Sequence, residues 1–310
     1  MKNWLLLLLL FSGCNVWSQD STNVSSALAD YKKRQWIIGG LTAAGYGGSF
    51  AFLSTAWYKD YPKTGFHTFN DAGEWQQIDK SGHAWTAYHT SRITTDFWRW
   101  AGVSDNKALW LGTSSSMLYM LSIEYLDGHS AEWGWSWADV GANLLGASLF
   151  ASQEGVWKEQ RVSLKFSTSL KTYEQDDLQQ RADQLFGSSF QGRLLKDYNA
   201  QTYWLSANLR SFLPQSNLPA WLNVAVGYGA ENMFGGYENI ARDKNGNLTF
   251  NRRDIKRYRQ WYVAPDVDFT KIKTNSKVLR TLFSAVNLLK FPAPALELSA
   301  GRLQIKAIAY

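Results

Sequence analysis

The sequence predicts an α+β protein, with a helical N-terminal half followed by a β-rich C-terminal part. Long uncharged stretches rich in glycine and alanine occur before residue 160, as in helices that pack closely together. Short segments that alternate apolar and polar residues occur after residue 161, as in half-buried antiparallel strands. We therefore expect a membrane-associated helical bundle over residues 35–160 and antiparallel hairpins over residues 161–310.

The first residues have the features of a signal peptide for export. Lys2 precedes an apolar run over residues 5–11, and two small residues follow this run, which is the order of the charged, apolar and cleavage regions. The run is too short to span a bilayer. Residues 1–18 are therefore expected to be a signal peptide, and residues 19–34 a polar spacer.

Two cleavage sites are compatible with this signal peptide. Cys14, the single cysteine of the chain, follows Phe-Ser-Gly, where lipoprotein processing would cut and acylate the thiol. Phe11 matches that motif imperfectly. Ordinary cleavage after Ser18 is the alternative and would discard the cysteine. Either product lacks an internal disulfide, so packing or a lipid anchor must stabilise it.

Composition and charge point to a membrane or cell-wall environment. Aromatic residues make up 15% of the chain, which fits rings gathered at a membrane interface or, alternatively, an aromatic core. A mean hydropathy of -0.31 argues against a polytopic transporter. The net charge is +6, and residues 251–290 hold ten Lys or Arg. Such a surface attracts anionic lipid or polysaccharide, unless it is only solvated. An exported protein is not expected to bind nucleic acid.

Four helices are expected in the N-terminal half. Residues 36–58 contain no charged residue and five glycines, and about twenty such residues can cross a bilayer. We expect a transmembrane or deeply embedded helix there, with a buried hairpin as the alternative. A second helix runs from Asp79 toward Trp100, and two shorter uncharged stretches cover residues 108–123 and 140–153. These two fit buried helices or helices lying in a membrane interface.

Alternation of apolar and polar residues marks the expected strands. It is seen in four segments, residues 162–166, 221–228, 261–269 and 296–308. Asn245-Gly246-Asn247 is a strong turn signal between two strands. A short amphipathic helix is expected over residues 281–291, before the break at Pro292.

Polar residues recur at one-turn spacing on the predicted helices. Residues three or four apart project from the same face of a helix, and burying a charge on an apolar helix is costly unless the charge has partners. We therefore expect these side chains to converge in one pocket. The candidate residues are Asp79, His83, Glu124, Asp139 and Asn143, with Lys80 and Asp127 in support.

Such a pocket would hold a divalent metal, or would supply a general base in His83 or Glu124. Structural roles are the alternative: Asp79 and Asp139 would be helix N-caps, and Glu124 would pair with Arg92 or Lys80. The motifs GxSxG, HExxH and GxxxxGK do not occur, so common hydrolase, zinc peptidase and nucleotide-binding classes lack their signatures. The sequence leaves open whether the chain is an enzyme.

Three motifs resemble a known family. They are Asp79-Lys80-Ser81-Gly82-His83, Ile123-Glu124-Tyr125-Leu126-Asp127-Gly128 and Trp135-Ser136-Trp137-Ala138-Asp139-Val140-Gly141-Ala142-Asn143-Leu144-Leu145-Gly146. In this order they resemble the YfiM-like family of predicted periplasmic lipoproteins, and the segments 195–206 and 227–230 are similar to its longer members. The looser resemblance is to VanZ-like membrane proteins, which are associated with glycopeptide-antibiotic resistance but are more hydrophobic throughout. Neither resemblance implies a reaction.

These observations predict an exported protein of the bacterial cell envelope. It would face the periplasm and associate with membrane lipid at the inner or the outer membrane. Its Asp/His/Glu/Asn pocket is expected to bind or act on a lipid-linked or cell-wall component, such as a polysaccharide. The alternative is a non-enzymatic lipoprotein that scaffolds or anchors an envelope complex. The sequence names neither a substrate nor an oligomeric state.

Overall fold

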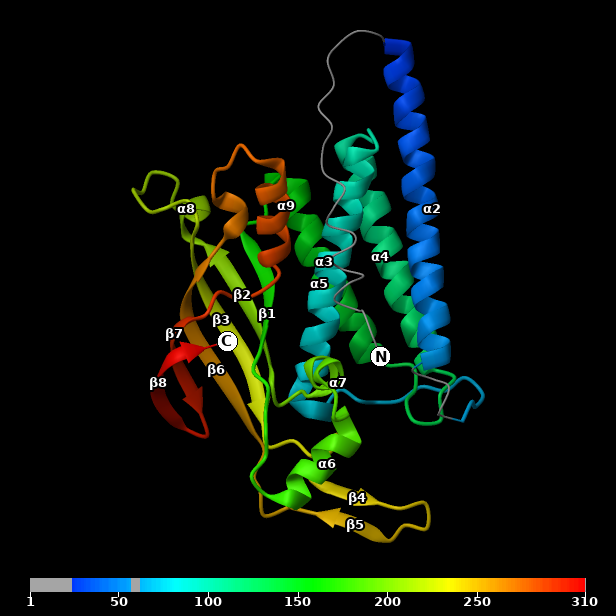
Figure 1. Cartoon of the computed structure of the whole chain (residues 1–310), viewed down its shortest axis with the longest axis vertical. Coiled ribbons are helices and arrows are strands. Elements are labelled where there is room, and N and C mark those ends of the chain that lie inside the picture. Colours follow the sequence, from blue (N-terminus) through cyan, green and yellow to red (C-terminus); the bar gives the residue numbers. More distant parts are fainter. Residues whose placement is uncertain (1–23, 57–61, 310) are drawn as a thin grey trace.

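Helices cover one side of an antiparallel sheet in the computed structural model, which describes residues 24–56 and 62–309 (Figure 1). The predicted α+β class is confirmed. The helices fill the N-terminal half and the six-stranded sheet fills the C-terminal half. The predicted signal peptide and Cys14 lie outside the described residues.

Four long helices form the helical layer: α2 (Val24–Ala56), α3 (Ile78–Trp100), α4 (Asp105–Asp127) and α5 (Trp137–Trp157). α3 is central, because α4 and α5 both pack along it and because it also contacts β1 and β2. The helix predicted from Asp79 is confirmed, and the two shorter predicted helices extend by several residues at both ends.

The prediction of a transmembrane helix over residues 36–58 is not supported. Most of this segment lies in α2, but no helix in the described parts of the chain is both long and apolar enough to cross a membrane. The segment is uncharged, yet five glycines and hydroxyl residues such as Thr42 and Tyr46 dilute its hydropathy.

A left-handed turn precedes α3. Trp75, Gln76 and Gln77, the last three residues of the short helix η2 (Glu74–Gln77), have φ values of 49°, 51° and 64°. Residues other than glycine rarely adopt this left-handed backbone conformation. Contacts from the C-terminal half hold the turn: Trp75 N donates to Gly236 O at 2.8 Å, and the Tyr228 hydroxyl donates to Gln76 O. The start of α3 is thus fixed by residues more than 150 positions away.

The main sheet has strictly antiparallel pairing, and its strand order is β1-β2-β3-β6-β7-β8. Its strands are β1 (Val162–Thr168), β2 (Gln201–Asn208), β3 (Leu222–Glu231), β6 (Tyr258–Val267), β7 (Ala293–Ser299) and β8 (Arg302–Ala309). The hairpin of β4 (Ile240–Arg242) and β5 (Leu248–Asn251) is inserted between β3 and β6. The turn predicted at Asn245-Gly246-Asn247 joins these two strands, with φ of 83° at Gly246.

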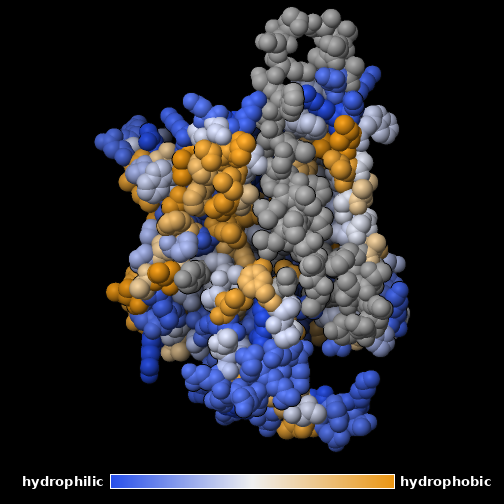
Figure 2. Space-filling model, in the orientation of Figure 1, coloured by the Kyte–Doolittle hydropathy of each residue, from blue (hydrophilic) through white to orange (hydrophobic). Residues whose placement is uncertain are grey.

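Shorter helices close the two ends of the sheet (Figure 1). α6 (Asp176–Phe186) and α7 (Phe190–Lys196) lie at the lower end, and α8 (Leu209–Phe212) and α9 (Lys277–Val286) lie at the upper end, with η3 (Phe269–Lys271) before α9. The helix expected over residues 281–291 is α9, which begins and ends earlier. In Figure 2, hydrophilic side chains gather around α6 and the β4–β5 hairpin, whereas apolar side chains gather around α9.

The sheet buries polar side chains on its inner face. Lys165 Nζ lies 2.8 Å from Asp266 Oδ2, and both side chains are 0% exposed. The Ser206 hydroxyl donates to the same carboxylate at 2.6 Å. The opposite, outer face carries apolar residues, and α3 covers it at β1, where Phe166 contacts Trp85. Beyond α3 this apolar face is exposed, as described below.

Candidate functional site

The predicted site residues lie together at the ends of α3, α4 and α5 nearest to α7 (Figure 1). α3 supplies three of them, α4 one, α5 two, and the loop before α3 adds an aspartate. We call this group the polar cluster, which consists of Asp71, Asp79, Lys80, His83, Glu124, Asp139 and Asn143.

His83 lies at the centre of the polar cluster. Its Nε2 atom is 3.9 Å from Asp79 Oδ1 and 3.7 Å from Asp139 Oδ1. Its Nδ1 atom is 3.2 Å from Asn143 Oδ1 and 3.4 Å from Glu124 Oε1. The two ring nitrogens therefore face two different sets of oxygen atoms, one on each side of the imidazole.

Lys80 provides the second positive charge. Its Nζ atom lies 2.6 Å from Asp71 Oδ2, 3.0 Å from Asp79 Oδ2 and 2.7 Å from Asp139 Oδ1. Burial favours the neutral amine, but the charges of Asp79 and Asp139 outweigh this effect and raise the pKa of Lys80. Lys80 is therefore a permanent ammonium ion at neutral pH.

The structure decides against the simpler structural roles of the acids. The N-cap of α3 is Gln77, and the N-cap of α5 is Ser136, whose hydroxyl accepts from Asp139 N at 3.0 Å. Asp79 and Asp139 instead lie in the first turns of their helices, where the helix dipole stabilises negative charge. Glu124 faces His83, and Arg92 donates to Ser284.

Three buried groups of the polar cluster have polar atoms without a hydrogen-bond partner among the described residues: Glu124, Asn143 and Asp139, whose Oδ1 atom has only the ion pair with Lys80. Glu124 is 1% exposed, and neither of its carboxyl oxygens has a hydrogen-bond partner among the described residues. Asn143 is fully buried, and its Nδ2 atom also has none. Buried polar atoms nearly always have partners in folded proteins, so such exceptions call for a specific explanation.

Burial and mutual repulsion shift the pKa values of the acids. Burial, the charge of Asp139 and that of Asp127 raise the pKa of Glu124 to about 8, although His83 opposes them. Burial also raises the pKa of Asp139, whereas His83 and Lys80 overcome burial at Asp79 and lower its pKa. At His83, burial is outweighed by Asp79, Asp139 and Glu124, and the pKa rises to about 9. Groups that titrate near neutral pH are suited to proton transfer.

Three residues of the site were missed by the sequence analysis. Asp71 pairs with Lys80, and Ser136 donates its hydroxyl to Asp71 Oδ1. The Tyr198 hydroxyl donates to Asp79 Oδ1 at 2.8 Å. Asp71 and Tyr198 lie in loops without a periodic signal, although Tyr198 belongs to the segment that resembles longer relatives. Asp127, which was predicted in support, acts through its charge on Glu124.

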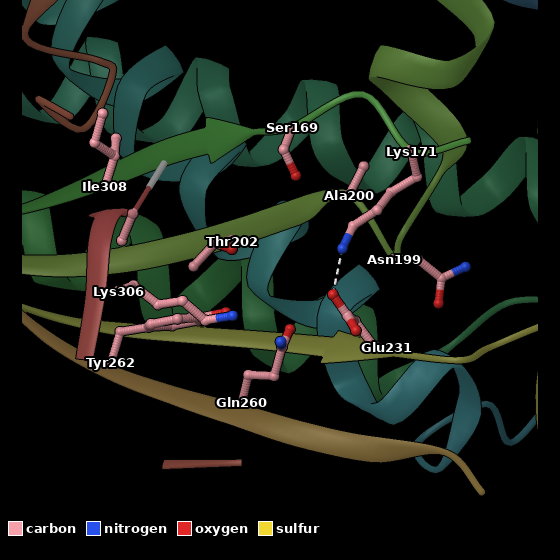
Figure 3. A pocket seen from close by; sticks show the side chains of 11 residues that line it. Ser169, Lys171, Asn199, Ala200, Thr202, Glu231, Gln260, Tyr262, Lys306 and Ile308 are labelled. Carbon is pink, nitrogen blue, oxygen red and sulfur yellow. Dashed lines mark hydrogen bonds and ion pairs between the residues drawn. The ribbon is translucent and has the colours of Figure 1, made fainter. Parts of the chain in front are cut away.

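A separate cavity of about 140 Å³ lies on the inner face of the sheet (Figure 3). Lys171 and Glu231 form an ion pair at one side of it, and Gln260, Tyr262 and Lys306 line the other part. No residue of the polar cluster lines this cavity. The polar cluster and the inner face of the sheet are therefore distinct places in the molecule.

Residues 67–152 match the family model described as Predicted periplasmic lipoprotein (DUF2279). This segment contains every residue of the polar cluster and ends before the sheet. No curated protein and no solved structure matches the chain. The match supports the class of periplasmic lipoproteins and a location in the cell envelope facing the periplasm. It confirms neither the YfiM-like name nor the resemblance to VanZ-like proteins, and its description names no reaction.

Proposed function

We propose that the polar cluster is the functional centre of this envelope protein, and that it binds or acts on a lipid-linked or cell-wall component. The observation that carries this proposal is the buried Glu124 beside the His83 imidazole, because its carboxyl oxygens find no hydrogen-bond partner in the described parts of the chain. Burying a carboxyl group without a hydrogen-bond partner destabilises the folded state, so a role in folding does not explain why Glu124 is buried there. Violations of this kind are typical of functional sites.

The chemistry that fits is proton transfer. Glu124, with a pKa of about 8, and His83, with a pKa of about 9, face each other across 3.4 Å. Both groups hold a proton at neutral pH, so either can give a proton to a bound substrate and then take one back. Asp79 and Asp139 position the Lys80 ammonium group, which would stabilise negative charge that develops on the substrate.

The test replaces His83 by Gln, Glu124 by Gln and Asp139 by Asn, one at a time, in cells that lack the wild-type copy. We expect each variant to be exported at normal abundance and to fail to restore resistance to detergents and cell-wall antibiotics. Glu238→Gln is the matched control, because Glu238 is an exposed acid paired with Arg253 on the surface. Full restoration by all three cluster variants would overturn the proposal.

A scaffold or anchor without catalysis is the second candidate. It is favoured by the dense internal pairing of Lys80 with three acids, which resembles a structural ion-pair network. A scaffold predicts that the same variants lose function only where abundance or melting temperature also falls. Normal abundance and melting temperature with lost function would exclude it.

The outer face of the sheet is proposed to contact membrane lipid. Neighbouring strands β6 and β7 place Val263 and Leu296 directly opposite each other, 49% and 48% exposed. Trp261 and Leu298 form the next pair and are exposed as well. Since the inner face of this sheet buries charges while the outer face exposes apolar residues, the usual polarity of a water-facing sheet is reversed. An apolar medium such as lipid suits this face.

Membrane washing tests the lipid contact. In a Cys14→Ala background, which cannot be acylated, we expect the chain to remain with membranes after alkaline carbonate washing. The pair Val263→Glu and Leu296→Glu should release it, whereas Leu248→Glu, equally exposed on the β4–β5 hairpin, should not. Release of the Cys14→Ala chain without further substitution would contradict the lipid contact. Retention of the doubly substituted chain would also contradict it.

Lipidation at Cys14 is tested separately by labelled palmitate. We propose that the wild-type chain incorporates the label and that Cys14→Ala does not. Equal labelling of both, or of neither, would leave cleavage after Ser18 as the processing route.

A further inference from the structure

We infer that the polar cluster is a site for a first-row divalent cation such as Zn²⁺ or Mn²⁺, with Asp79, His83 and Asp139 as ligands. One possible ligand atom from each of these residues lies within 4.8 Å of those of the other two. The inference deepens the proposed function, because it assigns an ion to the same cluster.

The spacing of these atoms suits an ion. His83 Nε2 is 3.9 Å and 3.7 Å from the two carboxylate oxygens. Ligands about 2.1 Å from a tetrahedral ion are about 3.4 Å apart. Side-chain shifts of a few tenths of an ångström would bring each carboxylate oxygen to this separation from His83 Nε2. Imidazole together with carboxylates is a ligand set that first-row divalent metals accept.

The other side of the imidazole is arranged as in established metal sites. A histidine that binds a metal through one nitrogen usually donates its other N–H to a carboxylate or a carbonyl oxygen. Nδ1 of His83 faces Asn143 Oδ1 at 3.2 Å and Glu124 Oε1 at 3.4 Å. A metal on Nε2 would leave the single ring proton on Nδ1. The buried Glu124 carboxyl, which has no hydrogen-bond partner among the described residues, would then accept this N–H or share it with Asn143.

The charges of the cluster point the same way. Four carboxyl groups, those of Asp71, Asp79, Glu124 and Asp139, face two cationic side chains, Lys80 and His83. Lys80 is held by Asp71 at 2.6 Å and reaches Asp79 through Oδ2, so Oδ1 of Asp79 remains turned toward His83 and Tyr198. Lys80 also contacts Asp139 Oδ1 at 2.7 Å, and an ion bound to that oxygen would take the place of this contact. A divalent cation between the two aspartates and the histidine would replace the proton on His83 Nε2 and compensate the excess of negative charge.

Titration of the purified, chelator-treated mature chain with Zn²⁺ and with Mn²⁺ tests the inference. We expect one ion per chain, and at least 100-fold weaker binding by Asp79→Asn, His83→Gln and Asp139→Asn. Glu124→Gln should weaken binding about 10- to 100-fold, since it supports a ligand without being one. Glu238→Gln should bind as the wild type does. Absence of binding by the wild type, or unchanged binding by the three ligand variants, would overturn the inference.

A second measurement needs no variant and so does not depend on variant folding. The Mn²⁺-loaded wild-type chain should show coupling of the electron spin to an imidazole ¹⁴N nucleus, and its absence would overturn the assignment of His83. The two proposals fail independently. If the wild-type chain binds no metal, the metal site is refuted, and the envelope phenotypes of the variants still test the proposed function. If the chain binds metal but the variants have wild-type envelope phenotypes, only the proposed function is refuted.

Discussion

Gly146 on α5 lies so close to Ala84 on α3 that a Cβ atom on Gly146 would stand 2.0 Å from the Ala84 carbonyl oxygen. This contact is next to the polar cluster, because Ala84 follows His83 and Asn143 is one turn before Gly146. The absence of a side chain at Gly146 therefore lets α5 approach α3 closely enough for Asn143 Oδ1 to reach His83 Nδ1 at 3.2 Å.

Replacing Gly146 by Ala is expected to lower the free energy of unfolding by about 1–3 kcal/mol, because the methyl group would push against rigid backbone. Chemical denaturation measures this change. Gly141→Ala is the matched control on the same helix, since nothing lies within 4 Å of its Cβ position. There the higher helix propensity of Ala should raise stability by about 0.5–1 kcal/mol. Equal effects at both positions would contradict the close approach of α3 and α5.

The left-handed turn before α3 gives a second prediction. Gln76 has φ of 51°, which a β-branched side chain tolerates poorly and glycine tolerates well. Gln76→Val is expected to destabilise the protein by about 1–2 kcal/mol, whereas Gln76→Gly should be neutral or stabilising. The bond from the Tyr228 hydroxyl goes to the Gln76 backbone and survives in both variants. Thermal unfolding of the pair tests this, and a less stable glycine variant would argue against the turn.

The buried charges of the sheet give a third prediction. Asp266 accepts from Ser206 and from Phe291 N and pairs with Lys165. Asp266→Ala would leave a buried ammonium ion without its main partner and should cost about 3–5 kcal/mol of stability. Glu238→Ala, which breaks an exposed pair with Arg253, should cost less than about 1 kcal/mol. Similar losses in the two variants would show that the inner face is hydrated.

His89 predicts a pH dependence of stability. Burial, helped by the positive charges of Arg92 on α3 and Lys165 on β1, lowers its pKa to about 3. Its Nε2–H donates to Leu164 O at 2.7 Å, so the folded protein holds the neutral ring. In the unfolded chain the ring takes up a proton below its usual pKa near 6.5. The stability that His89 contributes is therefore fully present above pH 6.5 and falls as the pH drops toward 3.

Urea unfolding between pH 7 and pH 5 measures this dependence. Below pH 6.5 the wild type should lose about 1.4 kcal/mol per pH unit from this residue. His89→Gln, which keeps a donor for Leu164 O, should show a shallower fall. His67→Gln, in the loop before α3, is the control and should follow the wild type. Identical slopes for His89→Gln and the wild type would refute the prediction.

The local features of this protein could be predicted from its sequence. Regular spacing within α3 places Asp79 and His83 on one face, and the same spacing in α5 does so for Asp139 and Asn143. Alternation located the segments of β1, β3 and β6. β2 was not predicted because its inward residues, such as Thr202 and Ser206, are polar and obscure the expected pattern. α6 was missed because it is largely polar.

Only the tertiary structure decided how these pieces combine. Alternation is the same whether the apolar face of a strand points inward or outward, so the sequence could not show that the sheet buries Lys165 and Asp266. It also could not show that Asp71 and Tyr198 reach the polar cluster from loops. Helix and strand periodicity arise from local backbone geometry, so they can be recognised from residues that are close together in the sequence. The polar cluster arises from packing between distant segments, where a glycine such as Gly146 fixes which side chains meet.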